Sequence, residues 1–190
     1  GAHSGSGAPA QLNAKQLSSC ISNARYRRGT EELRDTEALL MLASDHEAAL
    51  NHMHVGNLWN KLGKQRDAAA ERHRAATERL LVRTRALVST AGARELANVV
   101  HGLAKSEVGG REAAALFDAV AAEAIRRIRD FTAQELANTV WAYATAGVPA
   151  PALFAAAAAE AVGRLRDFDS QHLASTVWAY AKAGVQAPAL

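Results

Sequence analysis

Apolar and polar residues alternate in the segment 131–154 with the period of two amphipathic helices joined by a turn. Thr132 and Glu135 have the spacing of a capping box, so the first helix is expected to begin beside them. Gly147 favours the end of that helix, and Pro151 suits the first turn of a second one. The apolar positions of the first helix are Leu136, Ala137, Val140, Trp141, Tyr143 and Ala144. Their spacing predicts one continuous stripe, and the whole segment predicts a helix–turn–helix unit.

The same unit recurs directly afterwards. The 24 residues from Asp130 and the 24 residues from Asp167 are offset by 37 positions, and 18 of the aligned pairs are identical. Both copies contain the segment WAYA and the turn AGV-x-AP in register. Helix propensity alone does not produce such a match, so the chain contains an internal repeat.

Less similar copies precede these two. The residues equivalent to Leu136 are Leu17, Val55, Leu96 and Leu173, and the five positions are separated by 38, 41, 40 and 37 residues. A pair of amphipathic helices hides its apolar stripes only by stacking on neighbouring pairs. The sequence therefore predicts an all-α fold without a β-strand, an α-solenoid of about five helix–turn–helix repeats of 37–41 residues. Within it, Leu96, Leu136 and Leu173 are all expected to be buried between helices.

The repeats are expected to fill residues 11–190, after a flexible tail of residues 1–10. The expected units are about 11–51, 52–89, 90–129, 130–166 and 167–190. The last unit is incomplete, which indicates a fragment of a longer array. Long second helices are expected at 30–50, where acidic residues dominate, and at 67–88, where arginines do.

The composition limits the functions open to the chain. Of the 190 residues, 49% are apolar but only 5% aromatic, which favours closely packed helices built from small side chains. The net charge of +3 permits a polyanionic partner without requiring one. Cys20 is the only cysteine, so an internal disulfide and a cysteine-based zinc site are excluded. No apolar run is long enough for a membrane span, and residues 1–10 lack the apolar core of a signal peptide.

The segments QELANTVWAYATAG and QHLASTVWAYAKAG resemble the first-helix signature of octotricopeptide repeat proteins, and ARELANVVHGLAKSE from Ala93 is similar to it. Related helical repeats occur in FAST-kinase-like proteins that carry a RAP domain. No RAP-like segment is present here, so the resemblance does not extend to a nuclease activity. Tetratricopeptide repeats, at about 34 residues, do not fit the spacings.

The resemblance implies a sequence-selective RNA-binding solenoid of the mitochondrion or the chloroplast. Such a module would act in organellar RNA metabolism, translation or ribosome assembly. The implied partners are single-stranded RNA or ribosomal RNA, together with ribosomal or other proteins of a ribonucleoprotein such as the mitochondrial ribosome.

Two columns of residues recur at fixed distances from the template leucines. Two positions after them stand Ser19, Asn57, Asn98, Asn138 and Ser175, and nine positions after them stand Tyr26, Lys64, Lys105, Thr145 and Lys182. Amides and hydroxyls address base edges, and lysines neutralise phosphates. The candidate RNA-binding residues are Asn57, Lys64, Asn98, Lys105, Asn138, Thr145, Ser175 and Lys182.

A structural explanation is open for each of these residues. The asparagines can equally bond to the backbone of a neighbouring repeat, and a lysine at a helix end favours the helix dipole without any ligand. Trp141 and Trp178 belong to the apolar stripe and are expected in the core. The arginines of the second helices are expected on a solvated face.

Catalytic motifs are absent from the sequence. The seven histidines are scattered, and there is no HExxH motif, Gly-rich phosphate loop or nucleophile motif. These observations indicate no enzyme, no metal and no cofactor. Two functions stay open: an RNA-binding module, favoured by the basic stretch 61–105, and a protein–protein interaction scaffold in a larger complex, favoured by the acidic stretch 30–50.

Overall fold

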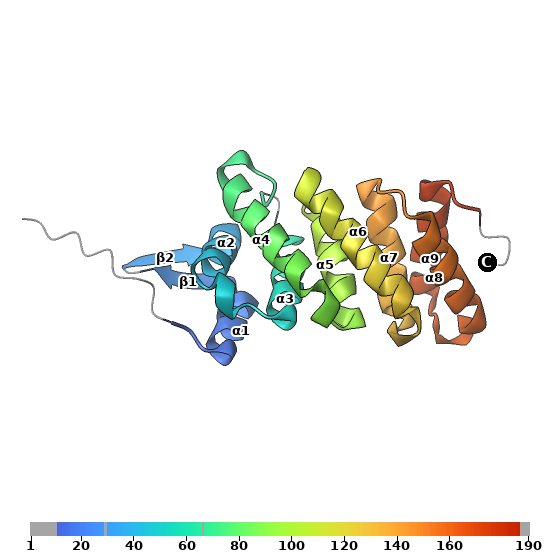
Figure 1. Cartoon of the computed structure of the whole chain (residues 1–190), viewed down its shortest axis with the longest axis horizontal. Coiled ribbons are helices and arrows are strands. Elements are labelled where there is room, and N and C mark those ends of the chain that lie inside the picture. Colours follow the sequence, from blue (N-terminus) through green and yellow to red (C-terminus); the bar gives the residue numbers. More distant parts are fainter. Residues whose placement is uncertain (1–10, 29, 66, 187–190) are drawn as a thin grey trace, which may run out of the picture.

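The structure is a computed structural model that describes residues 11–28, 30–65 and 67–186, most of which are helical (Figure 1). The α-helices are α1 (Ala14–Asn23), α2 (Asp35–Asp45), α3 (His52–Leu62), α4 (Arg74–Leu87), α5 (Ala93–Lys105), α6 (Arg111–Arg126), α7 (Ala133–Ala146), α8 (Pro151–Gly163) and α9 (Ser170–Ala183). Short 3-10 helices are η1 (Glu47–Ala49), η2 (Glu71–His73), η3 (Val88–Thr90), η4 (Ile128–Asp130) and η5 (Leu165–Asp167). The expected tail, residues 1–10, lies outside the described residues. Every helix of the described part is too short or too polar to cross a lipid bilayer.

The helices form two layers, arrayed side by side along the long axis of the molecule (Figure 1). In the first layer, α1, α3, α5, α7 and α9 contact one another in sequence order. In the second layer, α2, α4, α6 and α8 do the same. The predominantly helical class predicted from the sequence is confirmed, and consecutive helices along the chain alternate between the layers.

The first-layer helices begin at well-defined caps. The predicted capping box at α7 is confirmed: the Thr132 hydroxyl accepts from the Glu135 N–H at 3.3 Å, and the Thr132 N–H donates to a Glu135 carboxylate oxygen at 2.8 Å. Gly147 ends the helix with φ of 66°, as predicted for a left-handed cap. Similar reciprocal bonds hold the starts of α1 and α3. The sequence therefore fixes where these helices start, which in turn fixes which side of each faces solvent.

Buried tyrosines join each late first-layer helix to the preceding second-layer helix. The Tyr143 hydroxyl donates to the Phe117 carbonyl at 2.6 Å, and the Tyr180 hydroxyl donates to the Phe154 carbonyl at the same distance. In both pairs the rings pack edge to face with centroids 5.0 Å apart. The two contacts have the same sequence separation of 26 residues, so the repeated sequence builds a repeated core contact.

Arginines at the ends of second-layer helices bind the chain just before first-layer helices. Arg127 donates to the Ala91 carbonyl at 2.8 Å, and Arg164 donates to the Phe131 carbonyl at 2.9 Å. Each acceptor lies one residue before a helix N-cap. These arginines are therefore structural ties between the two layers, and the expectation that second-helix arginines form only a solvated face is wrong for them.

One backbone contact between α3 and α5 depends on glycine. A Cβ atom placed on Gly102 would lie 2.1 Å from the carbonyl oxygen of Trp59, far inside van der Waals contact. The equivalent position in α7 and α9 is occupied by the buried residues Ala142 and Ala179. Small residues at this position let the first-layer helices approach one another closely.

A β-hairpin replaces the start of the helix expected at 30–50. Strands β1 (Arg25–Arg28) and β2 (Glu31–Arg34) pair antiparallel, with Tyr26 opposite Leu33 and Arg27 opposite Glu32. The two apolar side chains are buried while the charged pair is exposed, a period of two that favours strands over helix. The prediction of a fold without a strand is thus wrong, and α2 begins only at Asp35.

The helix expected at 67–88 also begins later, at Arg74. Asp67 explains the difference, because it accepts hydrogen bonds from the Thr36 hydroxyl and from Arg72 and so anchors the preceding turn to α2. These bonds hold the pKa of the Asp67 carboxyl below its usual value, the Thr36 bond having the largest effect. This contact with α2 favours a turn at the start of the segment 67–88, although the sequence pattern there predicts a helix.

The expected burial of the template leucines is confirmed for two of them. Leu96 and Leu136 are buried, whereas Leu173 is 36% exposed, so the prediction is wrong for Leu173. In the first layer α7 lies between α5 and α9, but no helix among the described residues covers the other side of α9. Val177, on the same helix, is 59% exposed.

Candidate nucleic-acid interface

A stripe of solvent-accessible residues runs down each of the four later first-layer helices. The positions recur at i, i+4, i+7 and i+11, which places them on one side of a helix. Together they form what we call the open face: Met53, Asn57, Asn60 and Lys64; Arg94, Asn98, His101 and Lys105; Gln134, Asn138, Trp141 and Thr145; Gln171, Ser175, Trp178 and Lys182. Each of these side chains is exposed or half-buried, and adjacent helices of the layer are in contact. The open face is therefore one continuous surface.

The eight residues predicted from the sequence all lie on the open face. Asn57, Asn98, Asn138 and Ser175 occupy its second position, and Lys64, Lys105, Thr145 and Lys182 its fourth. Ser19, from the same predicted column, is exposed on α1. Tyr26 is different: it is buried in β1, and its hydroxyl donates to Asp45 at 3.0 Å. Burial and this bond raise the pKa of Tyr26 to about 12, so it belongs to the core of the hairpin.

Among the described residues, the polar groups at the second position have no hydrogen-bond partner. Neighbouring hydroxyls are used, since Thr139 and Thr176 donate to carbonyls one turn earlier at 2.7 and 2.8 Å. Within the described part of the chain, by contrast, the side chains of Asn57, Asn98 and Asn138 make no hydrogen bond to protein and are open to solvent. In the described structure these amides do not bond to the backbone of a neighbouring repeat, which was the alternative that the sequence left open. Their donors and acceptors are available to a ligand.

Charge is divided between the two layers. All five lysines lie in first-layer helices or directly after one, and none forms an ion pair among the described residues: Lys15, Lys61, Lys64, Lys105 and Lys182. Several second-layer arginines are instead bound to carboxylates, as in the pairs Arg74–Glu78 at 3.1 Å and Arg164–Asp167 at 3.0 Å. Arg79, Arg129 and Arg166 on the same side are exposed and form no ion pair among the described residues. The open face thus displays cations that no protein carboxylate neutralises.

Carboxylates are almost absent from the first-layer helices. Glu95 and Glu135 are the exceptions, and both are occupied, because each accepts the N–H of its own helix N-cap at 3.1 and 2.8 Å. None of the described open-face positions is Asp or Glu, while Lys64, Arg94, Lys105 and Lys182 make it positive. Such a surface attracts a polyanion, because no carboxylate among its described positions repels the negative charges of that ligand.

An aromatic row, formed by His101, Trp141 and Trp178, occupies the third position of the open face on α5, α7 and α9. The His101 and Trp141 ring centroids are 5.0 Å apart, and the Trp141 and Trp178 centroids are 6.3 Å apart with a 29° angle between the planes. The prediction that both tryptophans lie in the core is wrong for Trp178, which is 45% exposed. Trp141 is half-buried and packs against the core. Trp59 is the tryptophan of the core: it is fully buried and donates to Thr84 at 2.9 Å.

The spacing of the sequence already contained a signal for the aromatic row. Trp141 lies three residues after Asn138 and four before Thr145, so all three share one side of α7. The helical period therefore favours a position for Trp141 beside Asn138 and Thr145 rather than at the centre of the apolar stripe. Residue type misled the prediction, because Trp is usually well buried.

His101 reports on the electrostatics of the open face. Its pKa is lowered, first by burial and then by the positive charges of Lys105 and Lys64. The imidazole is therefore neutral at neutral pH, and the field of two successive lysines reaches the same ring. The cations of neighbouring helices act together on this surface.

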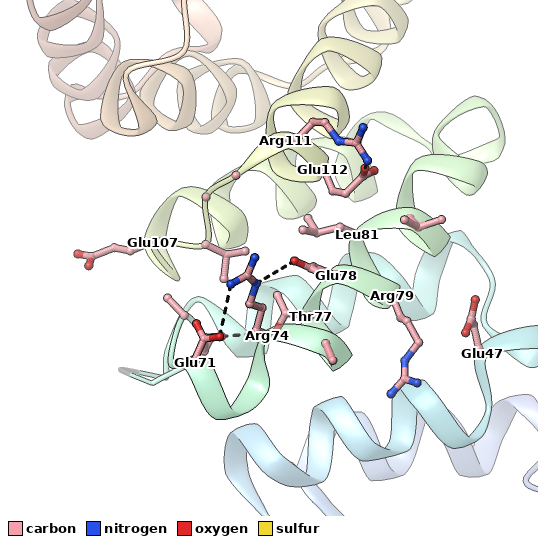
Figure 2. Close-up of a pocket in the computed structure, with 17 residues that line it drawn as sticks. Glu47, Glu71, Arg74, Thr77, Glu78, Arg79, Leu81, Glu107, Arg111 and Glu112 are labelled. Carbon is pink, nitrogen blue, oxygen red and sulfur yellow. Dashed lines mark hydrogen bonds and ion pairs between the residues drawn. The ribbon is translucent and has the colours of Figure 1, made fainter.

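A hollow of the described structure lies elsewhere. It has a volume of about 910 Å³ and is bordered by α4, the start of α6 and the segment 107–110. Figure 2 shows Arg74 between Glu71 and Glu78, to which it is paired at 3.4 and 3.1 Å. Arg111 and Glu112 pair with each other at 3.1 Å. Its lining also includes Glu47, Arg79 and Glu107, so charges of both signs surround the hollow and neither sign dominates it. The described residues bring no three potential metal ligands together there.

Comparisons of the sequence with models of protein families and with curated proteins gave no match. The candidate site therefore rests on the residues and their geometry.

Proposed function

We propose that this chain is an RNA-binding helical-repeat module, an α-solenoid of the octotricopeptide repeat kind, which holds single-stranded RNA along the open face. The observation that carries the proposal is the division of charge. Among the described residues, the lysines of the open face form no ion pair and the amides of Asn57, Asn98 and Asn138 form no hydrogen bond. Most second-layer arginines, by contrast, bind internal carboxylates or carbonyls.

The proposed binding mode assigns different tasks to the two predicted columns. Lys64, Lys105 and Lys182 contact phosphates, which positions the strand without reading its sequence. Asn98 and Asn138 reach base edges, where an amide offers both a donor and an acceptor. Successive first-layer helices repeat the pair of tasks, so each unit addresses about one nucleotide of a single strand, as in other helical RNA readers.

The setting follows from the resemblance of QELANTVWAYATAG and QHLASTVWAYAKAG to octotricopeptide repeats. On that basis the module acts in the mitochondrion or the chloroplast, in RNA metabolism, translation or the assembly of a ribosome. Its RNA is a transcript or a ribosomal RNA.

A protein-interaction scaffold is the second candidate, and a different surface favours it. Leu173 and Val177 on α9, Val162 near the end of α8 and Leu165 in η5 are between 36 and 59% exposed. Exposed apolar side chains of this number suit contact with another protein. The contact would lie at one end of the two layers and would leave the open face to RNA.

Salt-dependent affinity for single-stranded RNA tests the RNA proposal. Changing Lys64, Lys105 and Lys182 to Gln is expected to lower the slope of log affinity against log salt by about 2, at about 0.7 per phosphate contact. The matched control changes Arg79, Arg129 and Arg166 of the second-layer side to Gln, which removes the same charge from exposed positions. Equal effects of the two triple variants, or no binding of RNA by the unchanged protein, would contradict the proposal.

A further inference from the structure

The aromatic row places three ring side chains at solvent-accessible positions of the open face, His101 and Trp141 half-buried and Trp178 exposed. Trp178 leaves 45% of its surface in water, although burial of an indole is strongly favourable. Among the described residues the indole N–H groups of Trp141 and Trp178 have no acceptor, whereas that of Trp59 is bonded to Thr84. The two rings contact each other, and Trp141 also packs against the core, so each ring has both a supported side and a solvent-accessible part.

The row lies between the two predicted columns on each helix. On α7, Trp141 follows Asn138 by one turn and precedes Thr145 by one turn, and Trp178 on α9 lies in the same way between Ser175 and Lys182. An RNA strand whose phosphates contact the fourth position of the open face and whose base edges reach the second position must therefore place its bases over the third position. The rings there meet the faces of those bases.

We propose that His101, Trp141 and Trp178 form a stacking platform for consecutive unpaired bases of single-stranded RNA. The inference rests on the proposed function, and it names the part of the nucleic acid that the face recognises. Stacking on an aromatic ring accepts every base, because each base has a π-face. A neutral imidazole at His101 and two indoles supply three such surfaces on successive helices.

The stacking platform covers only part of the first layer, because α1 and α3 have no ring at the third position. The equivalent position on α3 is Asn60, and on α1 it is the exposed residue Ser22. Bases over α5, α7 and α9 are stacked and bind with little dependence on sequence, whereas a base over α3 is held by hydrogen bonds alone. The platform also selects for single strands, because the faces of paired bases in a duplex are already stacked on their neighbours.

Tryptophan substitutions test the platform. Trp141→Leu and Trp178→Leu keep apolar bulk but remove the ring, and each is expected to weaken binding of oligoadenylate about 5- to 150-fold, the range of one base–aromatic stack. The salt slope should not change, because no charge is lost. Trp178→Phe should retain most of the affinity. Val177→Ala is the matched control, since Val177 is 59% exposed beside Trp178 but lies outside the open face.

Two further measurements make the result independent of folding. In the unchanged protein, titration with oligoadenylate should quench tryptophan fluorescence, with the buried Trp59 as a constant background. Oligonucleotides that carry abasic sites should bind the unchanged protein more weakly than intact ones. The loss should be smaller for Trp178→Leu and smaller still for the double variant Trp141→Leu/Trp178→Leu, because fewer stacking contacts remain to be lost. Thermal melting identifies any variant that fails to fold, in which case the Phe variant and the quenching decide.

The outcomes separate the platform from the proposed function. If the unchanged protein binds no RNA, the proposed function fails and the platform fails with it. If it binds RNA with a lysine-dependent salt slope, but the folded Leu variants bind equally well and fluorescence is unchanged, the RNA module stands and the stacking platform is overturned.

Discussion

A methyl group at Gly102 is expected to force α3 and α5 apart. In Gly102→Ala the new Cβ would lie 2.1 Å from the carbonyl oxygen and 2.3 Å from the carbonyl carbon of Trp59. These are backbone atoms, so no side-chain rotation relieves the clash. Overpacking of a well-packed contact costs about 1 to 3 kcal/mol, and a distance this short places the cost at the upper end. The better helix propensity of Ala returns up to about 1 kcal/mol, which leaves a net loss of about 2 kcal/mol.

Gly163→Ala is the matched control for this change. Gly163 is the last residue of α8, and a Cβ placed there would meet nothing within 4 Å. The same substitution should therefore stabilise the protein by about 0.5 to 1 kcal/mol through helix propensity alone. Urea unfolding followed by circular dichroism gives both free energies. Equal changes in the two variants would refute the close approach of α3 and α5 on which the spacing of the open face depends.

Three further changes test the register, the base contacts and the imidazole. Leu136→Ala should lower the free energy of unfolding by about 2 to 5 kcal/mol, because Leu136 is 2% exposed and its removal leaves a cavity. Thr132→Ala should lower it by only about 1 kcal/mol, through the loss of the helix cap. Equal costs of the two changes in urea unfolding would disprove the register. Changing Asn98 and Asn138 to Ala should relax base preference by roughly 1 to 3 kcal/mol per position without altering the salt slope or the melting temperature; a lower melting temperature with unchanged preference would mean that the amides are structural. The pKa of His101 in the folded protein is lowered from 6.5, so the unfolded chain binds a proton first as the pH falls. The free energy of unfolding should therefore decline below about pH 6.5, and this loss should persist at pH values below the folded pKa. His101→Phe should remove that decline in pH-dependent unfolding, and an unchanged pH profile would contradict the assigned environment.

The sequence predicted best those features that depend on neighbours within a helix. Thr132 and Glu135 are three residues apart and fix their cap locally, and Gly147 adopts the left-handed conformation that ends α7. The positions of Asn138 and Thr145 on one side of α7 follow from the helical period alone. Local rules of this kind were sufficient to place all eight candidate residues on one surface.

Contacts between distant residues account for the errors. Tyr26 and Leu33 form a buried cross-strand pair, and the turn at Asp67 is held by Thr36, 31 residues away. Neither contact is visible in a helical pattern. Leu173 lies in a local sequence similar to that of Leu136, but its helix lacks a described neighbour on the outer side, so similar repeats differ in burial.

The structural use of the arginines could not be predicted either. Arg127 and Arg164 appear in the sequence as members of basic clusters, but each reaches across the layers to a backbone carbonyl 33 to 36 residues earlier. That acceptor exists only once the two helices of a unit have packed. The lysines make no such contact in the described structure, and this difference between two cation types became clear only from the fold.

Ultraviolet crosslinking of single-stranded RNA to the chain, followed by mass spectrometry of the modified peptides, tests the central claim most directly. Crosslinks are expected at the open face of α5, α7 and α9, foremost at Trp141 and Trp178, whose rings are half-buried and exposed respectively. Addition of salt should reduce their yield in parallel with the affinity. Crosslinks that concentrate instead on the second layer, around Arg79, Arg129 and Arg166, would contradict the claim that RNA lies across the first-layer helices.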